Sequence, residues 1–152
     1  MVNTDEKDTL VLFLDYLRGC MVAKAEGLDD EPLRRSTVPS GTSLLGLLKH
    51  LTMAETFWFQ HVFAGTDARV PDSDLADGDT MASVVVGYQA ACAAANEVVA
   101  ACDDLDRLGV RTGTRAVHLS LRWILVHMIE ETARHAGHAD ILREQIDGQV
   151  GR

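Results

Sequence analysis

Apolar side chains recur every three to four residues in four long stretches of this chain, and polar connections separate the stretches. This spacing places the apolar side chains on one face of an α-helix, and such a face needs another element to cover it. We therefore predict an all-α protein whose helices pack on one another. The expected helices span residues 4–26, 42 or 43 to 63, 80–102 and 120–145.

The connections between the expected helices are long, and prolines interrupt them. Pro32 and Pro39 lie between the first and second helices, and Pro71 lies with four aspartates between the second and third. Proline lacks a backbone N–H and fixes φ, so no long helix crosses these connections. We expect a four-helix bundle with long connections, whose topology is not limited to simple up-and-down. A chain of 152 residues suits one such domain, over residues 1–152.

Charge and composition indicate which kinds of partner the protein does not bind and where in the cell it is expected. The chain carries 23 acidic and 14 basic side chains, a net charge of −9, whereas surfaces that bind nucleic acid or anionic membranes need clustered Lys and Arg. No apolar run approaches the ~20 residues of a transmembrane helix, and the polar N-terminus does not resemble a signal peptide. We expect a cytoplasmic protein that binds neither nucleic acid nor a membrane. Cys20, Cys92 and Cys102, odd in number and without C-x-x-C spacing, are expected to stay free thiols.

Ionisable side chains interrupt the apolar stripe of the fourth expected helix. His127, Glu131 and His135 stand four residues apart, so they stack on one helix face, and His138 follows three residues later. Apolar residues at either end of this face indicate that it points toward the core. An unpaired carboxylate or imidazole buried there costs on the order of several kcal/mol. A bound divalent metal removes this cost, because it offsets the carboxylate charge and satisfies the imidazole nitrogens.

One helix offers two or three ligands to a single ion, so a further ligand must come from elsewhere. His50 is the natural candidate, since it lies beside Leu47 and Ala54 at the inner edge of the second helix's stripe. Two imidazoles and one carboxylate leave a coordination position for water or substrate, as in catalytic zinc sites. Iron, nickel and manganese accept the same ligands.

A structural explanation of the same residues stays open on spacing alone. A histidine in an amphipathic helix is more often a boundary residue than a ligand, and a Glu–His pair four residues apart can be a surface pair worth ~0.2–0.5 kcal/mol. We interpret Glu130 as solvated, and His61 and His118 as structural. The chain contains no G-x-G-x-x-G, P-loop, G-x-S-x-G or H-E-x-x-H motif, and no paired Glu-x-x-His motifs of a di-iron centre.

Three segments give the chain a specific family resemblance. They read LDYLRGCMVAKAEGLDDEPLRR near the start, VPSGTSLLGLLKHLTMAETFWF in the first half and LRWILVHMIEETARHAGHADILREQIDG near the end. With them the chain resembles the DinB-like (YfiT-like) metal-binding superfamily, within the actinobacterial branch related to mycothiol-dependent enzymes. The resemblance implies a four-helix bundle with a crossover connection. It also implies a homodimer, since members are often dimeric.

The resemblance implies a ligand set as well. Members typically hold one metal with a His from the second helix and an H-x-x-x-H pair from the fourth, which correspond to His50 and to Glu131 with His135. Glu131 replaces the first His of that pair, and relatives such as mycothiol-dependent maleylpyruvate isomerase resemble this chain in using a His–Glu–His set. His138 is then expected either to support a ligand or to contact substrate, and His127, one turn before Glu131, to be an extra ligand or a proton carrier. Both are candidate catalytic residues.

The activity implied by the resemblance is that of a divalent-metal-dependent S-transferase or isomerase acting on small electrophiles. Its cofactor would be a divalent metal, zinc first and nickel, iron or manganese next, and its cosubstrate a low-molecular-weight thiol such as mycothiol. A metal-bound thiol loses its proton and becomes a nucleophile at neutral pH. A hydrolase that uses metal-bound water, and a non-enzymatic, stress-related metal-binding module, are the alternative functions.

Overall fold

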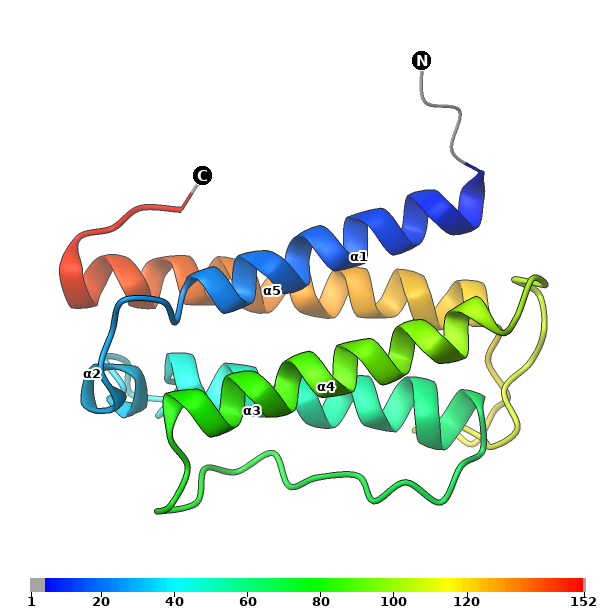
Figure 1. Ribbon diagram of the computed structural model, residues 1–152, viewed down its shortest axis with the longest axis horizontal. Helices are drawn as coiled ribbons and strands as arrows, with labels where there is room; N and C mark the ends of the chain where they lie inside the picture. Colours follow the sequence, from blue (N-terminus) through cyan, green and yellow to red (C-terminus); the bar gives the residue numbers. More distant parts are fainter. Residues whose placement is uncertain (1–4, 152) are drawn as a thin grey trace.

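The computed structural model describes residues 5–151 of the chain, which fold into helices joined by irregular connections (Figure 1). The helices are α1 (Glu6–Ala23), α2 (Asp30–Arg34), α3 (Leu44–Glu55), the π-helix η1 (Thr56–Phe63), α4 (Met81–Ala100) and α5 (Leu121–Asp147). Within residues 5–151, β pairing is limited to an isolated bridge between Leu108 and Ser120. The predicted all-α, four-helix architecture is confirmed. The expected start of the first helix at residue 4 lies outside the described residues.

Each of the four long helices begins where a side chain caps the first turn and accepts a hydrogen bond from a backbone N–H three residues later. These caps are Asp5, Ser43, Thr80 and Ser120. Capping satisfies amide groups that lack a partner inside the helix, which fixes where each helix starts. At the far end of α5, Gly148 adopts a φ of 78°, a left-handed conformation that glycine reaches without strain, and its N–H bonds to the Glu144 carbonyl.

The long helices form two layers with a crossover between two of them (Figure 1). α1 and α5 lie side by side and run in the same direction, and α3 with η1 lies beside α4, again in the same direction. The connection over residues 64–80 therefore runs back along the bundle from the end of η1 to the start of α4. Because α3 and α5 run in opposite directions, the first turns of α3 lie near the C-terminal half of α5. The crossover connection implied by the family resemblance is thus present.

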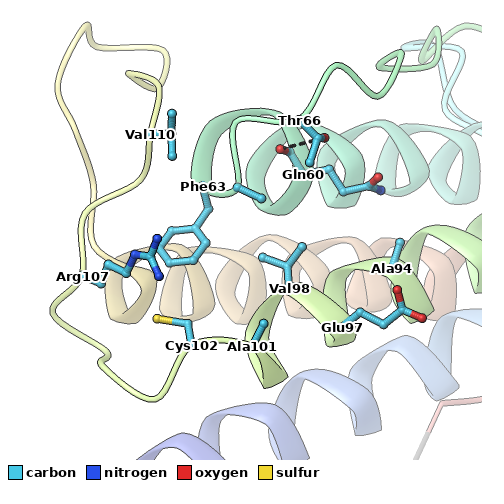
Figure 2. Close-up of a pocket in the computed structure, with 11 residues that line it drawn as sticks. Gln60, Phe63, Thr66, Ala94, Glu97, Val98, Ala101, Cys102, Arg107 and Val110 are labelled. Atoms are coloured by element: carbon cyan, nitrogen blue, oxygen red, sulfur yellow. Dashed lines mark hydrogen bonds between the residues drawn. The ribbon is translucent and has the colours of Figure 1, made fainter.

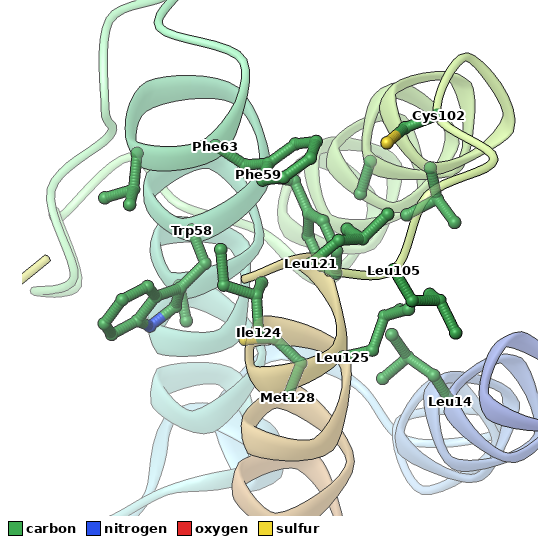
Figure 3. Packing of buried hydrophobic residues seen from close by; sticks show 14 residues of the cluster. Leu14, Trp58, Phe59, Phe63, Cys102, Leu105, Leu121, Ile124, Leu125 and Met128 are labelled. Carbon is green, nitrogen blue, oxygen red and sulfur yellow. The ribbon is translucent and has the colours of Figure 1, made fainter. Parts of the chain in front are cut away.

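Two clusters of buried apolar side chains fill the space between the helices. Figure 3 shows the first, in which Trp58, Phe59 and Phe63 of η1 pack against Leu121, Ile124, Leu125 and Met128 of α5. The second lies toward the other end of the bundle and includes Leu33, Leu45, Leu48, Tyr88 and Leu142. Each of the long helices contributes to both clusters, so the helices are packed together at both ends of the bundle.

The structure of residues 5–151 tests two predictions made from the composition, on membrane-spanning helices and on the cysteines. None of the helices within residues 5–151 combines the length and the apolar character that crossing a membrane requires. Cys20, Cys92 and Cys102 are free thiols, as predicted. Burial raises the pKa of Cys92 to about 12, so this thiol stays protonated at neutral pH.

The structure departs from the predicted helices at two places. Residues 30–34 form the short helix α2 inside a predicted connection, and Pro32 is tolerated there because it lies in the first turn. The predicted second helix, expected as one α-helix to residue 63, changes to the π-helix η1 after Glu55. The hydroxyls of Thr52 and Thr56 donate to carbonyls four residues earlier, on either side of Glu55, and such bonds often bend a helix.

A buried ion pair joins three helices between the two apolar clusters. Glu55 is fully buried and Arg18 is 5% exposed, and the guanidinium donates two hydrogen bonds to the carboxylate, at 2.7 and 2.5 Å. Arg18 also donates to Asp15 of α1 and to Asn96 of α4, each at 2.7 Å. Burial raises the pKa of Glu55, and the bonds from Arg18 oppose that effect. The pair therefore ties α1, α3 and α4 together in a fixed register.

Replacing Arg18 with alanine should lower the free energy of unfolding by about 3–5 kcal/mol, because the Glu55 carboxylate would stay buried without its partner. Urea unfolding followed by circular dichroism measures this loss. Arg122→Ala is the matched control, since Arg122 pairs with the exposed carboxylates of Glu6 and Asp106, and exposed pairs contribute little. Equal losses in the two variants would contradict a stabilising role for the buried pair.

Candidate metal centre

Three ionisable side chains from two helices converge at the edge of the bundle. Oε1 of Glu131 on α5 lies 2.8 Å from Nε2 of His50 on α3 and 3.1 Å from Nε2 of His135, one turn further along α5. One nitrogen or oxygen atom from each residue can be chosen so that all three atoms lie within 4.8 Å of one another. The rings of the two histidines meet edge to face. The structure thus brings together the three residues predicted as metal ligands, hereafter the triad.

The position of the triad follows from the apolar stripes of its two helices. His50 borders the buried Leu47 on α3, and Glu131 and His135 border the buried Thr132 on α5. The side chains of His50, Glu131 and His135 are 34%, 21% and 17% exposed. The triad is therefore half-buried at the border of the core and open to solvent on one side, whereas the apolar pattern alone predicted an inward-facing position.

The triad holds the charges that a divalent cation needs. Partial burial disfavours the ionised form of Glu131, but the interactions with His50 and His135, which include a hydrogen bond from each, outweigh it and lower the pKa of the Glu131 carboxyl. Burial also lowers the pKa of His135, against the attraction of Glu131, which favours the neutral imidazole. An ionised carboxylate and neutral imidazoles are the forms that bind metals. Ligand atoms around a tetrahedral zinc lie about 3.4 Å apart, a spacing comparable with that of the triad.

The two histidines predicted as catalytic lie in different surroundings. His138 is exposed, and its Nδ1 lies 3.4 Å from Nδ1 of His135. The ring of His127 stacks on Trp123 and meets Trp58 edge to face, with centroids 4.9 Å apart in both pairs. The structure therefore places His138 beside a predicted ligand and places His127 among aromatic side chains.

The residues interpreted as structural or solvated make contacts that fit those roles. Arg111 donates a hydrogen bond to Nδ1 of His61, and Nδ1 of His118 donates to the carbonyl of Gly109. Glu130 is exposed and accepts a hydrogen bond from Arg134, one turn along α5. None of these residues reaches the triad.

Two cavities flank the triad near the first turns of α3. One, of about 370 Å³, lies beside His50, and the other, of about 330 Å³, lies beside His138. Ser40 and Thr42 line both cavities, so the connection before α3 forms a polar wall next to both histidines. The cavity beside His50 is also lined by Ser43, Gly46, Ser73 and Asp74.

Sequence periodicity missed these lining residues, because connections have no repeating apolar pattern. The signal that could have found them is the run of small and hydroxyl residues, PSGTS, directly before the predicted second helix. Such a run caps a helix and brings several hydroxyl groups together beside its first turn.

A further cavity, of about 420 Å³, lies beside the C-terminal end of η1, between η1 and α4 (Figure 2). Phe63, Val98 and Val110 contribute apolar surface to it, and Glu97 and Arg107 contribute charged groups. No residue of the triad lines this cavity. It is therefore separate from the candidate metal centre.

Comparisons with known proteins agree with the fold and with the resemblance. A family model described as mycothiol-S-transferase matches residues 9–148. The structure of a DinB-like protein from Bacillus cereus is similar with a TM-score of 0.69 and 16% identity, over 94% of each chain. A conserved protein from Enterococcus faecalis is similar with a TM-score of 0.67 and 14% identity, over 96% of this chain and 99% of that one. Among curated proteins, no match to this chain is found.

The two solved structures share so few identical residues that they show a common fold and nothing more. That fold agrees with the DinB-like bundle expected from the sequence. The match to the family model begins within α1 and extends past the end of α5, so it includes both helices that carry the triad. The chain therefore belongs to the mycothiol-S-transferase family.

Proposed function

We propose that this protein is a divalent-metal-dependent S-transferase that joins a mycothiol-type thiol to small electrophiles. The observation that carries the proposal is the convergence of His50, Glu131 and His135 at a solvent-open edge of the bundle. Membership of the mycothiol-S-transferase family supports the choice of thiol. These three residues are the proposed metal ligands, with zinc as the first candidate metal and nickel, iron or manganese as alternatives.

The donor set fits a catalytic metal better than a structural one. Structural zinc sites surround the ion with four protein ligands, whereas catalytic sites use three and leave a position open. The triad supplies three ligands, and its partial exposure leaves access for a substrate sulfur from the solvent side. When bound, a divalent cation supplies the positive charge that keeps a coordinated thiol deprotonated near neutral pH.

The polar cavity beside His50 suits the thiol cosubstrate. A sugar-bearing thiol presents several hydroxyl groups, which need hydrogen-bond partners when they leave water. Ser40, Thr42, Ser73 and Asp74 line the cavity with groups of this kind. The cavity volume of about 370 Å³ is within the range of small-molecule sites. In the proposed complex this wall orients the thiol so that its sulfur points toward the triad.

The proposed reaction forms a carbon–sulfur bond and releases a proton. The thiol loses its proton, the sulfur attacks the electrophilic carbon, and for a halogenated substrate the carbon–halogen bond breaks and the halide leaves. His138, exposed and 3.4 Å from the His135 ring, accepts the thiol proton and passes it to solvent. Cys20, Cys92 and Cys102 lie outside the triad, so the nucleophile comes from the cosubstrate.

Elemental analysis of the purified protein should find about one divalent metal per chain, and dialysis against EDTA should remove it. The metal-free protein should melt at a lower temperature, because an ion that binds only the folded state stabilises that state by mass action. His50→Ala, Glu131→Gln and His135→Ala should each lose most of the metal, whereas the control His118→Ala should keep it. Metal content and melting temperature that EDTA leaves unchanged would refute the metal site.

Metal affinity should fall on acidification. The pKa values of His135 and Glu131 are both lowered, so neither side chain holds a proton against the metal above roughly pH 6.5. Affinity should therefore change little above the ordinary histidine pKa of roughly 6.5 and fall as the pH drops below it. Stability of the metal-free protein should fall in the same direction, because the unfolded chain protonates His135 more readily than the folded one.

Competition with a chromophoric zinc chelator measures the affinity, and thermal unfolding of the metal-free protein measures the stability. In His135→Gln the loss of stability below roughly pH 6.5 should be smaller, since the side chain that titrates there is gone. A metal affinity that rises as the pH falls would contradict the prediction.

The transferase proposal predicts turnover that depends on thiol. Zinc-loaded wild-type protein should conjugate mycothiol to a chlorinated aromatic electrophile, measured as loss of free thiol and release of chloride. His50→Ala should lower kcat/KM on the order of 100-fold or more, whereas His118→Ala should not change it. Equal activity in wild type and His50→Ala, or no turnover in either, would overturn the proposal. Turnover without added thiol would indicate a hydrolase instead.

A further inference from the structure

We infer that a row of aromatic side chains beside the triad binds the electrophile and selects substrates whose reactive carbon belongs to a planar, electron-poor ring system. This row, the aromatic strip, consists of Phe57 and Trp58 of η1 and Trp123 and His127 of α5. The inference rests on the proposed transferase function and names the substrate class of the same site.

The rings of the aromatic strip form a continuous set of contacts between η1 and α5. Measured between centroids, the Trp58 ring lies 5.5 Å from Trp123 and 4.9 Å from His127. His127 stacks on Trp123 at 4.9 Å with 20° between the ring planes, and Phe57 meets Trp58 edge to face at 5.1 Å. Stacked and edge-on rings about 4.5–7 Å apart attract one another. The strip is therefore ordered before any ligand arrives.

The aromatic strip begins within one helical turn of the triad. His127 precedes Glu131 by four residues on the same face of α5, which corresponds to about 6 Å along the helix axis, and Trp123 lies about 12 Å from Glu131 along that axis. The polar cavities lie on the other side of the triad, near the first turns of α3, whereas η1 extends α3 away from them. A thiol in the polar cavity and a ring on the strip would therefore reach the triad from opposite sides.

Part of the aromatic strip is accessible to a ligand. Trp123 is 41% exposed and the side chain of His127 is 26% exposed, so both rings present aromatic surface to solvent. Trp58 is only 7% exposed, and the connection before α5 holds it closely: a β-carbon added to Gly113 would lie 2.8 Å from the indole. The strip thus combines a buried ring that is held in place, Trp58, with an exposed aromatic surface on which a planar ligand can stack.

The chemistry of the reaction favours an electron-poor ring on this surface. A ring carbon that a thiolate can attack carries electron-withdrawing groups such as nitro, carbonyl or halogen substituents. The face of an indole carries negative charge density, so it attracts a ring whose own face has been made electron-poor. The groups that make the substrate reactive therefore also strengthen its stacking on Trp123. Substitution then joins sulfur to the ring carbon, and the halide leaves with the electrons of the broken bond.

Binding of dinitrobenzene to the metal-free protein tests the inference without any turnover. Both tryptophans of the chain, Trp58 and Trp123, lie in the aromatic strip, so a bound nitroaromatic should quench their fluorescence. Trp123→Leu, followed through Trp58, should weaken binding about threefold to tenfold, and Trp123→Phe, which keeps a ring, should retain most of it. Val86→Ala changes an exposed apolar position on α4 and should leave binding unchanged.

Turnover by the zinc-loaded protein adds a second readout. Trp123→Leu should raise the KM for chlorodinitrobenzene about threefold to tenfold and leave the KM for iodoacetamide, which has no ring, unchanged. Equal changes for both electrophiles, or dinitrobenzene binding that Trp123→Leu does not alter, would overturn the inference. Ring-dependent binding by a protein that never conjugates thiols would support the aromatic strip as a binding site and refute the transferase proposal alone.

Discussion

The buried pair between Arg18 and Glu55 fixes the positions on which the rest of the bundle depends. It connects α1 to α3 directly and reaches α4 through Asn96. Since α1 in turn packs along α5, the placement of α3 against α5 is determined from inside the core. Glu55 follows His50 by five residues and ends α3 where the π-helix begins. The ion pair thus helps to hold His50 opposite Glu131, although the triad itself stays at the edge of the core.

The four helices and the grouping of His50 with Glu131 and His135 could be predicted because they follow from rules that act along a single helix. Apolar residues three and four apart define a buried face, and ionisable residues that interrupt this face indicate a binding site. Spacing alone could not separate Glu131 and His135 from His127 and His138, since all four lie close together on α5. The family resemblance made that choice, and the observed convergence of the three side chains agrees with it.

Rules that act along a single helix could not predict features that depend on contacts between different elements. Arg18 and Glu55 are 37 residues apart, and the sequence pattern of its own helix does not distinguish either from an ordinary surface charge. His127 continues the row of predicted ligands on α5, yet it packs against Trp58 on another helix. The π-helix depends on how the residues after Glu55 pack, which periodicity does not record. The homodimer and the cytoplasmic location stay predictions from the sequence.

The pairing of α1 with α5 has a consequence for how the protein is made. Along the chain α5 follows α1 only after α2, α3, η1 and α4, so the face of α1 that packs on α5 stays uncovered until α5 has been synthesised. Such distant pairings form slowly, because a long loop must close before any contact compensates for the lost entropy. The triad also joins α3 to α5, so the three proposed ligands come together only once α5 is present. The proposed metal would therefore bind only after α5 has packed against α3.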